Sequence, residues 1–135
     1  MAFTRYVMRY FYSDIFRRFA YFSIIGAINT AIHLGAVVML VELMDLSPVA
    51  SNCLAFVAAN IFSFYANCRW NYRTPMAVSR YKRFFIISLA GLLITAGVSA
   101  VTYQMGLHYL IATAIVFVTL PVLTFIAHHW WTWDK

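Results

Sequence analysis

Charged residues divide the chain into long apolar stretches. Residues 19–41 and 46–68 contain no Asp, Glu, Lys or Arg, and neither do residues 84–133, which Gly106 and His108 interrupt. A helix of about 20 apolar residues crosses the roughly 30 Å hydrocarbon core of a bilayer. These runs do not alternate with polar residues as the strands of a membrane barrel do. The pattern therefore predicts an all-α integral membrane protein with four transmembrane helices, at residues 19–42, 47–68, 84–105 and 109–131.

The composition supports a lipid-exposed protein. Of the 135 residues, 64% are hydrophobic and only 10% are charged, whereas a soluble domain carries about 25% charged residues. The ten Lys and Arg residues give a net charge of +6, but they are clustered beside the apolar stretches. This clustering indicates membrane topology rather than nucleic-acid binding. Membrane lipids are therefore the expected surroundings, and nucleic acid is not an expected partner.

All ten basic residues fall on one side of the predicted bundle. They are Arg5, Arg9, Arg17, Arg18, Arg69, Arg73, Arg80, Lys82, Arg83 and Lys135. The loops on the opposite side carry no Lys or Arg, and the first of them holds the acidic residues Glu42 and Asp45. Because basic residues are retained on the cytoplasmic side of a membrane, both termini are predicted to be cytoplasmic.

The segment before the first span has a helical pattern of its own. Its polar residues recur every four positions, at Arg5, Arg9, Ser13 and Arg17. Aromatic and aliphatic residues occupy another face of the same helix. We therefore expect residues 1–18 to form an amphipathic helix in the cytoplasmic interface, separate from the transmembrane domain at residues 19–135. A frayed basic tail that only sets topology is the alternative.

The two halves of the chain resemble each other. The stretch FYANCRWNY at residues 64–72 is echoed by FIAHHWWTW at residues 125–133, and each ends an apolar stretch. In the first span Ser23, Gly26, Thr30 and Ala31 match Ser88, Gly91, Thr95 and Ala96. A two-helix unit repeated in tandem enters the membrane from the same side each time. The sequence therefore predicts two parallel repeats, residues 18–72 and 83–133.

Two motifs carry a resemblance to a known family. They are Gly26-Ala-Ile-Asn29-Thr30 in the first span and Phe64-x-x-Asn67-x-Arg69-Trp70-x-Tyr72 at the end of the second. With four predicted spans, the chain resembles the GtrA-like family over nearly its whole length. The resemblance implies a protein of the bacterial inner membrane that moves polyprenyl-phosphate-linked sugars for the glycosylation of cell-surface polysaccharides. In the second repeat His128-His129-Trp130 replaces the usual Arg-bearing end, so phosphate binding is expected at the first repeat.

Polar side chains within the spans are candidates for a sugar-binding path. Asn29, Thr30 and His33 lie in the first span, and Asn60, Ser63 and Asn67 lie in the second. Polar groups at membrane depth are costly and often functional. Structural alternatives stay open, because Ser and Thr also bond their own helix backbone and Asn also joins neighbouring helices. A histidine in a span is also found as a satisfied structural residue.

Arginines at the mouths of the spans are candidates for binding the phosphate. Arg18, Arg69 and Arg83 each adjoin the cytoplasmic end of a predicted span, and the guanidinium fork matches phosphate oxygens. Trp70 offers an aromatic face for a sugar ring. Positive-inside topology explains the same arginines without a ligand, and the aromatic belt of a membrane interface explains Trp70.

Translocation of a polyprenyl-phosphate-linked sugar is the favoured function. No charged residue lies in the middle of a predicted span, which disfavours an ion-coupled small-molecule exporter. The sequence also offers no nucleophile, metal cluster or paired carboxylates, so we expect neither an enzyme nor a cofactor. A non-transporting subunit that docks a membrane glycosyltransferase is the alternative. Four helices enclose little volume, so a homo-oligomer is expected.

Overall fold

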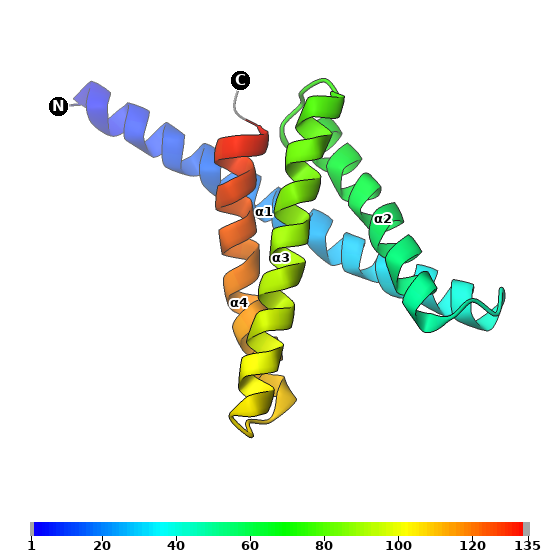
Figure 1. Ribbon diagram of the computed structural model, residues 1–135. Coiled ribbons are helices and arrows are strands. Elements are labelled where there is room, and N and C mark those ends of the chain that lie inside the picture. Colours follow the sequence, from blue (N-terminus) through cyan, green and yellow to red (C-terminus); the bar gives the residue numbers. More distant parts are fainter. Residues whose placement is uncertain (1, 134–135) are drawn as a thin grey trace. The chain divides into compact units, whose positions relative to one another are not determined.

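The structure of the protein is a computed structural model. It describes the backbone of residues 2–133 and their side chains, except those at residues 2–7, 48–49, 109–110 and 112–113. The elements are α1 (Ala2–Glu42), α2 (Pro48–Ala66), η1 (Asn67–Asn71), α3 (Val78–Gln104), α4 (Tyr109–Ala127) and η2 (His128–Thr132), where η marks a short π-helix (Figure 1). Residues 2–133 contain no strand, which confirms the predicted all-α fold.

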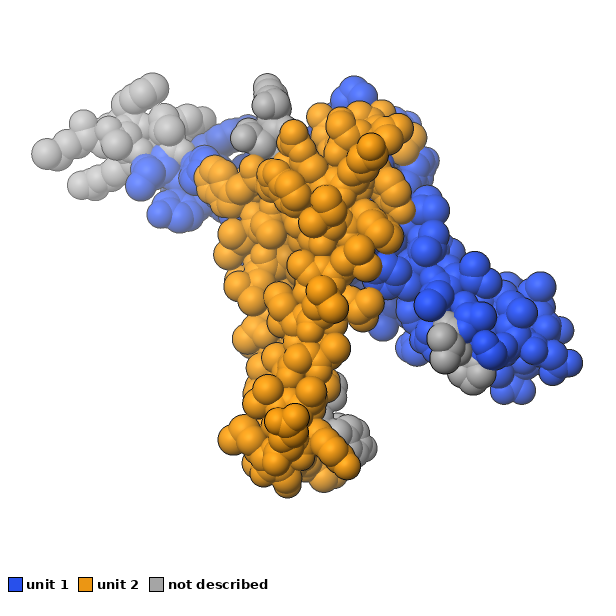
Figure 2. Space-filling model, in the orientation of Figure 1, with its two compact units in different colours: residues 1–75 blue, residues 76–135 orange. Residues whose placement is uncertain are grey.

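The chain forms two compact units, residues 1–75 and residues 76–135 (Figure 2). Unit 1 contains α1, α2 and η1, whereas unit 2 contains α3, α4 and η2. In each unit the second helix and its π-helix both pack against the first helix. The division between the units falls in the loop between the two predicted repeats.

Three helices in the described part of the chain are long and apolar enough to cross a membrane. They are Met8–Glu42, Val78–Gln104 and Ala114–Thr132. At most 17% of the most apolar window of each helix is buried within the protein. Their large outward-facing apolar surface is what a lipid-embedded helix presents. Three of the four predicted spans therefore correspond to helices with the length and composition of membrane spans.

The remaining predicted span, residues 47–68, corresponds to α2. This helix covers Pro48–Ala66, which is 19 residues, or about 28 Å at 1.5 Å per residue. It is not one of the three helices that meet the length and hydropathy requirement over the described residues. The helix is therefore present where the sequence placed it, and its crossing of the membrane stays a prediction.

Helix α1 continues through the boundary expected at residue 18. It is 41 residues long, or about 60 Å, which is roughly twice the thickness of a hydrocarbon core. Residues 2–25 contain neither Gly nor Pro, so nothing in this stretch interrupts the backbone hydrogen bonds. The expected separate N-terminal helix is thus joined to the first span without a break. Its location in the membrane interface stays a prediction.

Unit 1 is an antiparallel hairpin of α1 and α2. The hydroxyl of Ser47 accepts a hydrogen bond from the backbone N–H of Ala50 at 3.3 Å and caps the start of α2. Near this loop His33 on α1 lies 3.3 Å from Asn52 on α2, measured between Nε2 and Oδ1. Further from the loop, η1 contacts α1. The second helix therefore returns along the first.

Unit 2 is a second hairpin, formed by α3 and α4. Gly106 ends α3 with a left-handed backbone (φ 68°), and the N–H groups of Gly106 and Leu107 bond the carbonyls of Tyr103 and Thr102, both at 3.0 Å. This pair of bonds is a Schellman motif, which satisfies carbonyls at the helix end. The loop lies where the sequence predicted it.

Gly91 lets α4 approach α3 closely. A Cβ atom at Gly91 would lie 3.4 Å from Thr124 Cγ2 and 3.6 Å from Leu120 Cδ1. Gly97, on the same helix, has no neighbouring atom within 4 Å of the equivalent position. The two glycines therefore differ in whether a larger side chain has room.

The Gly91→Leu substitution is expected to destabilise unit 2. Forcing extra carbon atoms into a packed contact costs about 1–3 kcal/mol, whereas Gly97→Leu adds its side chain in open space. Thermal unfolding of both variants in detergent measures the difference. Equal melting temperatures for the two variants would contradict this packing.

Candidate functional site

A π-helix ends the second helix of each unit. Helix α2 begins at Pro48 and α4 begins at Tyr109, 61 residues later, and η1 and η2 are displaced by the same number. Each π-helix closes with an i→i−5 backbone bond, from the N–H of Tyr72 to the carbonyl of Asn67 at 2.8 Å and from Trp133 to His128 at 3.1 Å. Such wide turns are rare and often lie at functional sites.

A hydrogen bond between two buried side chains joins the first and last residues of each π-helix. In η1, Asn71 Nδ2 donates to Asn67 Oδ1 at 3.0 Å. In η2, His128 Nδ1 and Thr132 Oγ1 share a hydrogen bond of 3.0 Å. All four residues are buried. We call this pair of end residues the lock of the turn.

Asn67, a predicted substrate-binding residue, lies inside the turn. Its side chain is fully buried, and its Nδ2 donates to the carbonyl of Ser63 at 2.9 Å. Its Oδ1 accepts the bond from Asn71. Both the amide nitrogen and the amide oxygen of Asn67 are thus used in hydrogen bonds that hold η1. The predicted site residue Ser63 takes part through its backbone carbonyl.

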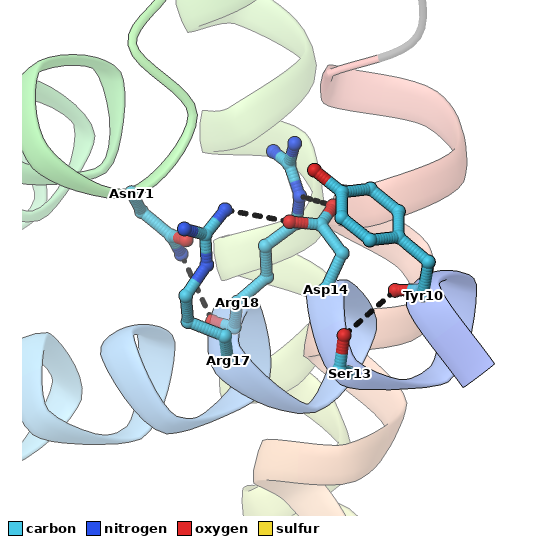
Figure 3. A network of polar contacts seen from close by, with 6 residues as sticks. All are labelled: Tyr10, Ser13, Asp14, Arg17, Arg18 and Asn71. Atoms are coloured by element: carbon cyan, nitrogen blue, oxygen red, sulfur yellow. Dashed lines mark hydrogen bonds and ion pairs between the residues drawn. The ribbon is translucent and has the colours of Figure 1, made fainter. Parts of the chain in front are cut away.

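Arg18 lies beside η1 and is held on three sides. Its carbonyl accepts a bond from Asn71 Nδ2 at 3.1 Å, and its Nε donates to Asp14 Oδ2 at 2.7 Å (Figure 3). Its guanidinium carbon lies 4.9 Å from the centre of the Tyr72 ring, which is a cation–π distance. Burial raises the pKa of the Tyr72 phenol, so the ring stays neutral beneath the cation.

Asp14 also bonds a second arginine. Arg17 Nη2 donates to Asp14 Oδ1 at 2.6 Å, so one carboxylate bridges two guanidinium groups (Figure 3). These pairs are partly exposed, and such ion pairs contribute at most about 1 kcal/mol. The carboxylate thus orients the two cations more than it stabilises the fold.

Arg69 and Trp70 lie in the middle of η1 and point outward. Both side chains are exposed. Among the described residues, the one ring contact of Trp70 is an edge contact with Tyr65, with 6.2 Å between ring centres. Within the described part of the chain, Arg69 makes no hydrogen bond or ion pair. Of the three predicted phosphate-binding arginines, Arg69 is therefore the most accessible to a ligand.

Arg83 lies in the other unit and has a structural contact. Its Nη1 donates to the backbone carbonyl of Trp131 in η2 at 3.0 Å. Beside it, Phe84 stacks on the His128 ring with 4.3 Å between ring centres. Arg18 and Arg69 thus both lie around η1, whereas convergence of Arg83 with them stays a prediction.

The predicted polar path in unit 1 is heterogeneous. The Thr30 hydroxyl bonds the carbonyl of Gly26 at 3.1 Å, as the structural alternative expects. His33 pairs with Asn52, and Asn60 is buried. The amide oxygen of Asn29 is buried and accepts no hydrogen bond from any described residue. An unsatisfied buried acceptor costs about 1–3 kcal/mol, and the amide oxygen of Asn29 carries such a cost.

Sequence reasoning missed three residues of this site. Asn71, Asp14 and Tyr72 all contact Arg18, yet only Arg18 was named as a candidate. The four-residue spacing of Asn67 and Asn71 was visible in the sequence. A search for polar pairs at helical spacing would therefore have found the lock.

No group of three His, Cys, Asp or Glu residues that would suit a metal ion occurs among the described residues. Around η1 the structure places arginine, amide and aromatic side chains. Arginine guanidinium groups bind anions through charge-assisted hydrogen bonds.

Comparison with known proteins gives the family. Residues 21–133 match the family described as GtrA/DPMS, transmembrane domain. The chain is 36% identical over 66 residues to a bactoprenol-linked glucose translocase of Salmonella phage P22, covering 49% of this chain and 55% of that protein. It is 35% identical over 63 residues to a bactoprenol-linked glucose translocase of Shigella flexneri, covering 47% and 50%. The matched segment thus spans about half the length of each relative.

The resemblance drawn from the two sequence motifs is confirmed by this match. The family description also names a transmembrane domain, in agreement with the apolar helices of both units. Because the match covers most of its length, the chain belongs to the GtrA/DPMS transmembrane-domain family.

Proposed function

We propose that this protein moves a polyprenyl-phosphate-linked sugar from the cytoplasmic to the outer leaflet of a bacterial inner membrane. The observation that carries the proposal is the outward-pointing pair of Arg69 and Trp70 on η1. The membership in a family with relatives named as bactoprenol-linked glucose translocases supports the same substrate class. The proposed role is non-catalytic and requires no cofactor.

The phosphate binds at η1. The Arg69 guanidinium offers two parallel N–H donors to phosphate oxygens, which gives charge-assisted hydrogen bonds. Among the described residues, no carboxylate pairs with this guanidinium. The exposed face of Trp70 stacks on the first sugar ring. The polyprenyl tail remains in the bilayer, against the exposed apolar side chains of the helices.

The sugar passes along the polar residues of unit 1. The free carbonyl of Asn29 accepts a hydrogen bond from a sugar hydroxyl, and the His33–Asn52 pair offers further partners nearer the loop. Asn60, Ser63 and Thr30 complete the path. The hydrocarbon core contains no water to hydrogen-bond the sugar hydroxyls. Hydrogen bonds from these polar side chains to the hydroxyls take the place of the lost bonds to water.

The topology follows from the charges and the repeated boundaries. The equal displacement of α2–η1 and α4–η2 supports two tandem repeats, each a pair of transmembrane helices. The clustering of the basic residues supports a cytoplasmic location for the π-helices and both termini. A homo-oligomer supplies the volume that one four-helix chain lacks.

Purified protein in liposomes is expected to move labelled polyprenyl-phosphate glucose between leaflets. The measurement is the rate at which an added glycosidase or chemical quencher gains access to the label, compared with protein-free vesicles. No acceleration, together with loss of activity of a co-expressed glycosyltransferase when the chain is deleted, would replace translocation by the docking role.

Replacing Arg69 by Ala is expected to lower the initial transport rate at low substrate about tenfold, because a charge-assisted hydrogen bond contributes about 1.5–3 kcal/mol. Arg9→Ala is the matched control, since Arg9 is also basic and exposed but lies on α1 far along the chain from η1. Equal rates for the two variants would remove Arg69 from the site.

The Asn29→Leu substitution is expected to slow transport while raising thermal stability. It removes a buried acceptor without a described partner, which relieves about 1 kcal/mol or more of desolvation cost. It also removes a partner for the sugar. Melting temperature and liposome transport are measured together, with Ile28→Leu as the control. Full transport by the Asn29 variant would show that this amide has no role in the path.

A further inference from the structure

We propose that Asn71 is a positioning residue that fixes Arg69 and Arg18 relative to each other, so that both can bind the substrate phosphate. The inference rests on the proposed function, since it concerns the same phosphate site. Asn71 does not itself contact the ligand in this proposal. It acts through the two arginines.

The side chain of Asn71 joins two elements. Its single amide nitrogen donates to Asn67 Oδ1 at 3.0 Å. It also donates to the carbonyl of Arg18 at 3.1 Å, a bond drawn in Figure 3. The first bond lies within η1 and the second reaches α1, 53 residues away in sequence. Asn71 is also 93% buried, with 7% of its surface exposed. Both bonds are therefore shielded from competing water.

The lock fixes the backbone from which Arg69 projects. Arg69 lies midway between Asn67 and Asn71, so a hydrogen bond between these end residues restricts the whole wide turn. The Arg69 side chain itself is exposed and has no described partner to orient it. Its direction depends on the backbone that the lock holds.

Arg18 is positioned by the same segment. Asn71 bonds the Arg18 carbonyl, and the next residue, Tyr72, lies under the Arg18 guanidinium at 4.9 Å. Main chain and side chain of Arg18 are thus both tied to the end of η1. A shift of the turn moves both cations together.

Stability alone does not account for Asn71. Its amide oxygen is buried and accepts no hydrogen bond from the described residues, at a cost of about 1–3 kcal/mol. This cost offsets much of what its two donated bonds contribute. A buried polar atom without a hydrogen-bond partner is uncommon in folded proteins and calls for an explanation other than stability.

Unit 2 provides an internal comparison. The lock of η2 is made by His128 and Thr132, but Trp130 occupies the place that Arg69 has in η1. The same type of turn is therefore closed without an arginine to present. Thr132 is the matched control, because its loss opens a lock in a turn from which no arginine projects. Arg83 lies on α3 and donates its guanidinium to the carbonyl of Trp131 in that turn.

A mutant cycle that combines Asn71→Leu with Arg69→Ala and Arg18→Ala tests the proposal. Half-saturating concentration and maximal rate for polyprenyl-phosphate glucose are measured in liposomes, and binding of the same lipid is measured in detergent by Trp fluorescence. Asn71→Leu is expected to raise the half-saturating concentration about tenfold with little change in maximal rate. When Arg69→Ala is combined with Arg18→Ala, Asn71→Leu is expected to add less than twofold, because its effect passes through these two arginines.

Thr132→Val is expected to lower the melting temperature but to leave the half-saturating concentration unchanged. A tenfold effect of Asn71→Leu that persists when both Arg69 and Arg18 are replaced by Ala would overturn the proposal, as would an effect on stability and maximal rate alone. If Asn71→Leu does not fold, Asn71→Ser enters the same cycle, because it is too short to reach both acceptors.

The binding measurement separates this proposal from the proposed function. Wild-type protein that binds the lipid but does not move it would end the translocase proposal, while the cycle in binding would still decide the role of Asn71. Wild-type protein that neither binds nor moves the lipid would overturn both.

Discussion

Lipid supplies no hydrogen bonds, so a chain in a membrane must satisfy its own backbone polar groups. The long helices meet this requirement along their length, and the remaining problem is their ends. Four of these ends are closed by identifiable contacts. Ser47 caps α2, Gly106 ends α3 in a Schellman motif, and the second helix of each unit ends in a π-helix whose end residues are tied together.

The two units solve the same end problem with opposite contacts. In unit 1 a side chain of η1 donates to the backbone of α1, through Asn71 and Arg18. In unit 2 a side chain of α3 donates to the backbone of η2, through Arg83 and Trp131. The second arrangement uses the arginine charge for structure. The first leaves the charge of Arg69 free of described partners, which is the physical basis for placing the substrate phosphate there.

Much of this architecture could be predicted because hydropathy acts over whole helices. The uncharged stretches located both bounds of α2 and α4 and the C-terminal ends of α1 and α3 within a few residues, and the loop at Gly106 followed from an interruption in the pattern. The π-helices could not be predicted, because five residues are too few for their period to differ visibly from that of an α-helix. The continuity of α1 was not predicted, for a different reason. The positions of the charged residues indicate where the membrane surface lies, but they do not indicate whether the helix is interrupted there.

The site was predicted only in part. Arg69 and Trp70 were chosen for their chemistry and are exposed, whereas Asn67 was chosen for the same reason and is enclosed in the turn. Asn71 acts on Arg18, 53 residues away, and the sequence pattern of one helix does not contain such a contact. Contacts between side chains in the folded structure, rather than residue type, decided which polar groups remain accessible to a ligand.

The π-helices also make the number of residues in each turn important for packing. In an α-helix, residues seven apart share a face, because seven steps of 100° complete nearly two turns. Phe64 and Tyr72 are eight apart, as are Phe125 and Trp133, and the extra residue in each wide turn brings both members of a pair to the packed side. The two turns of this chain are closed by different pairs, Asn–Asn and His–Thr. Insertion or deletion of one residue in either turn would rotate the residues that follow it by about 100°.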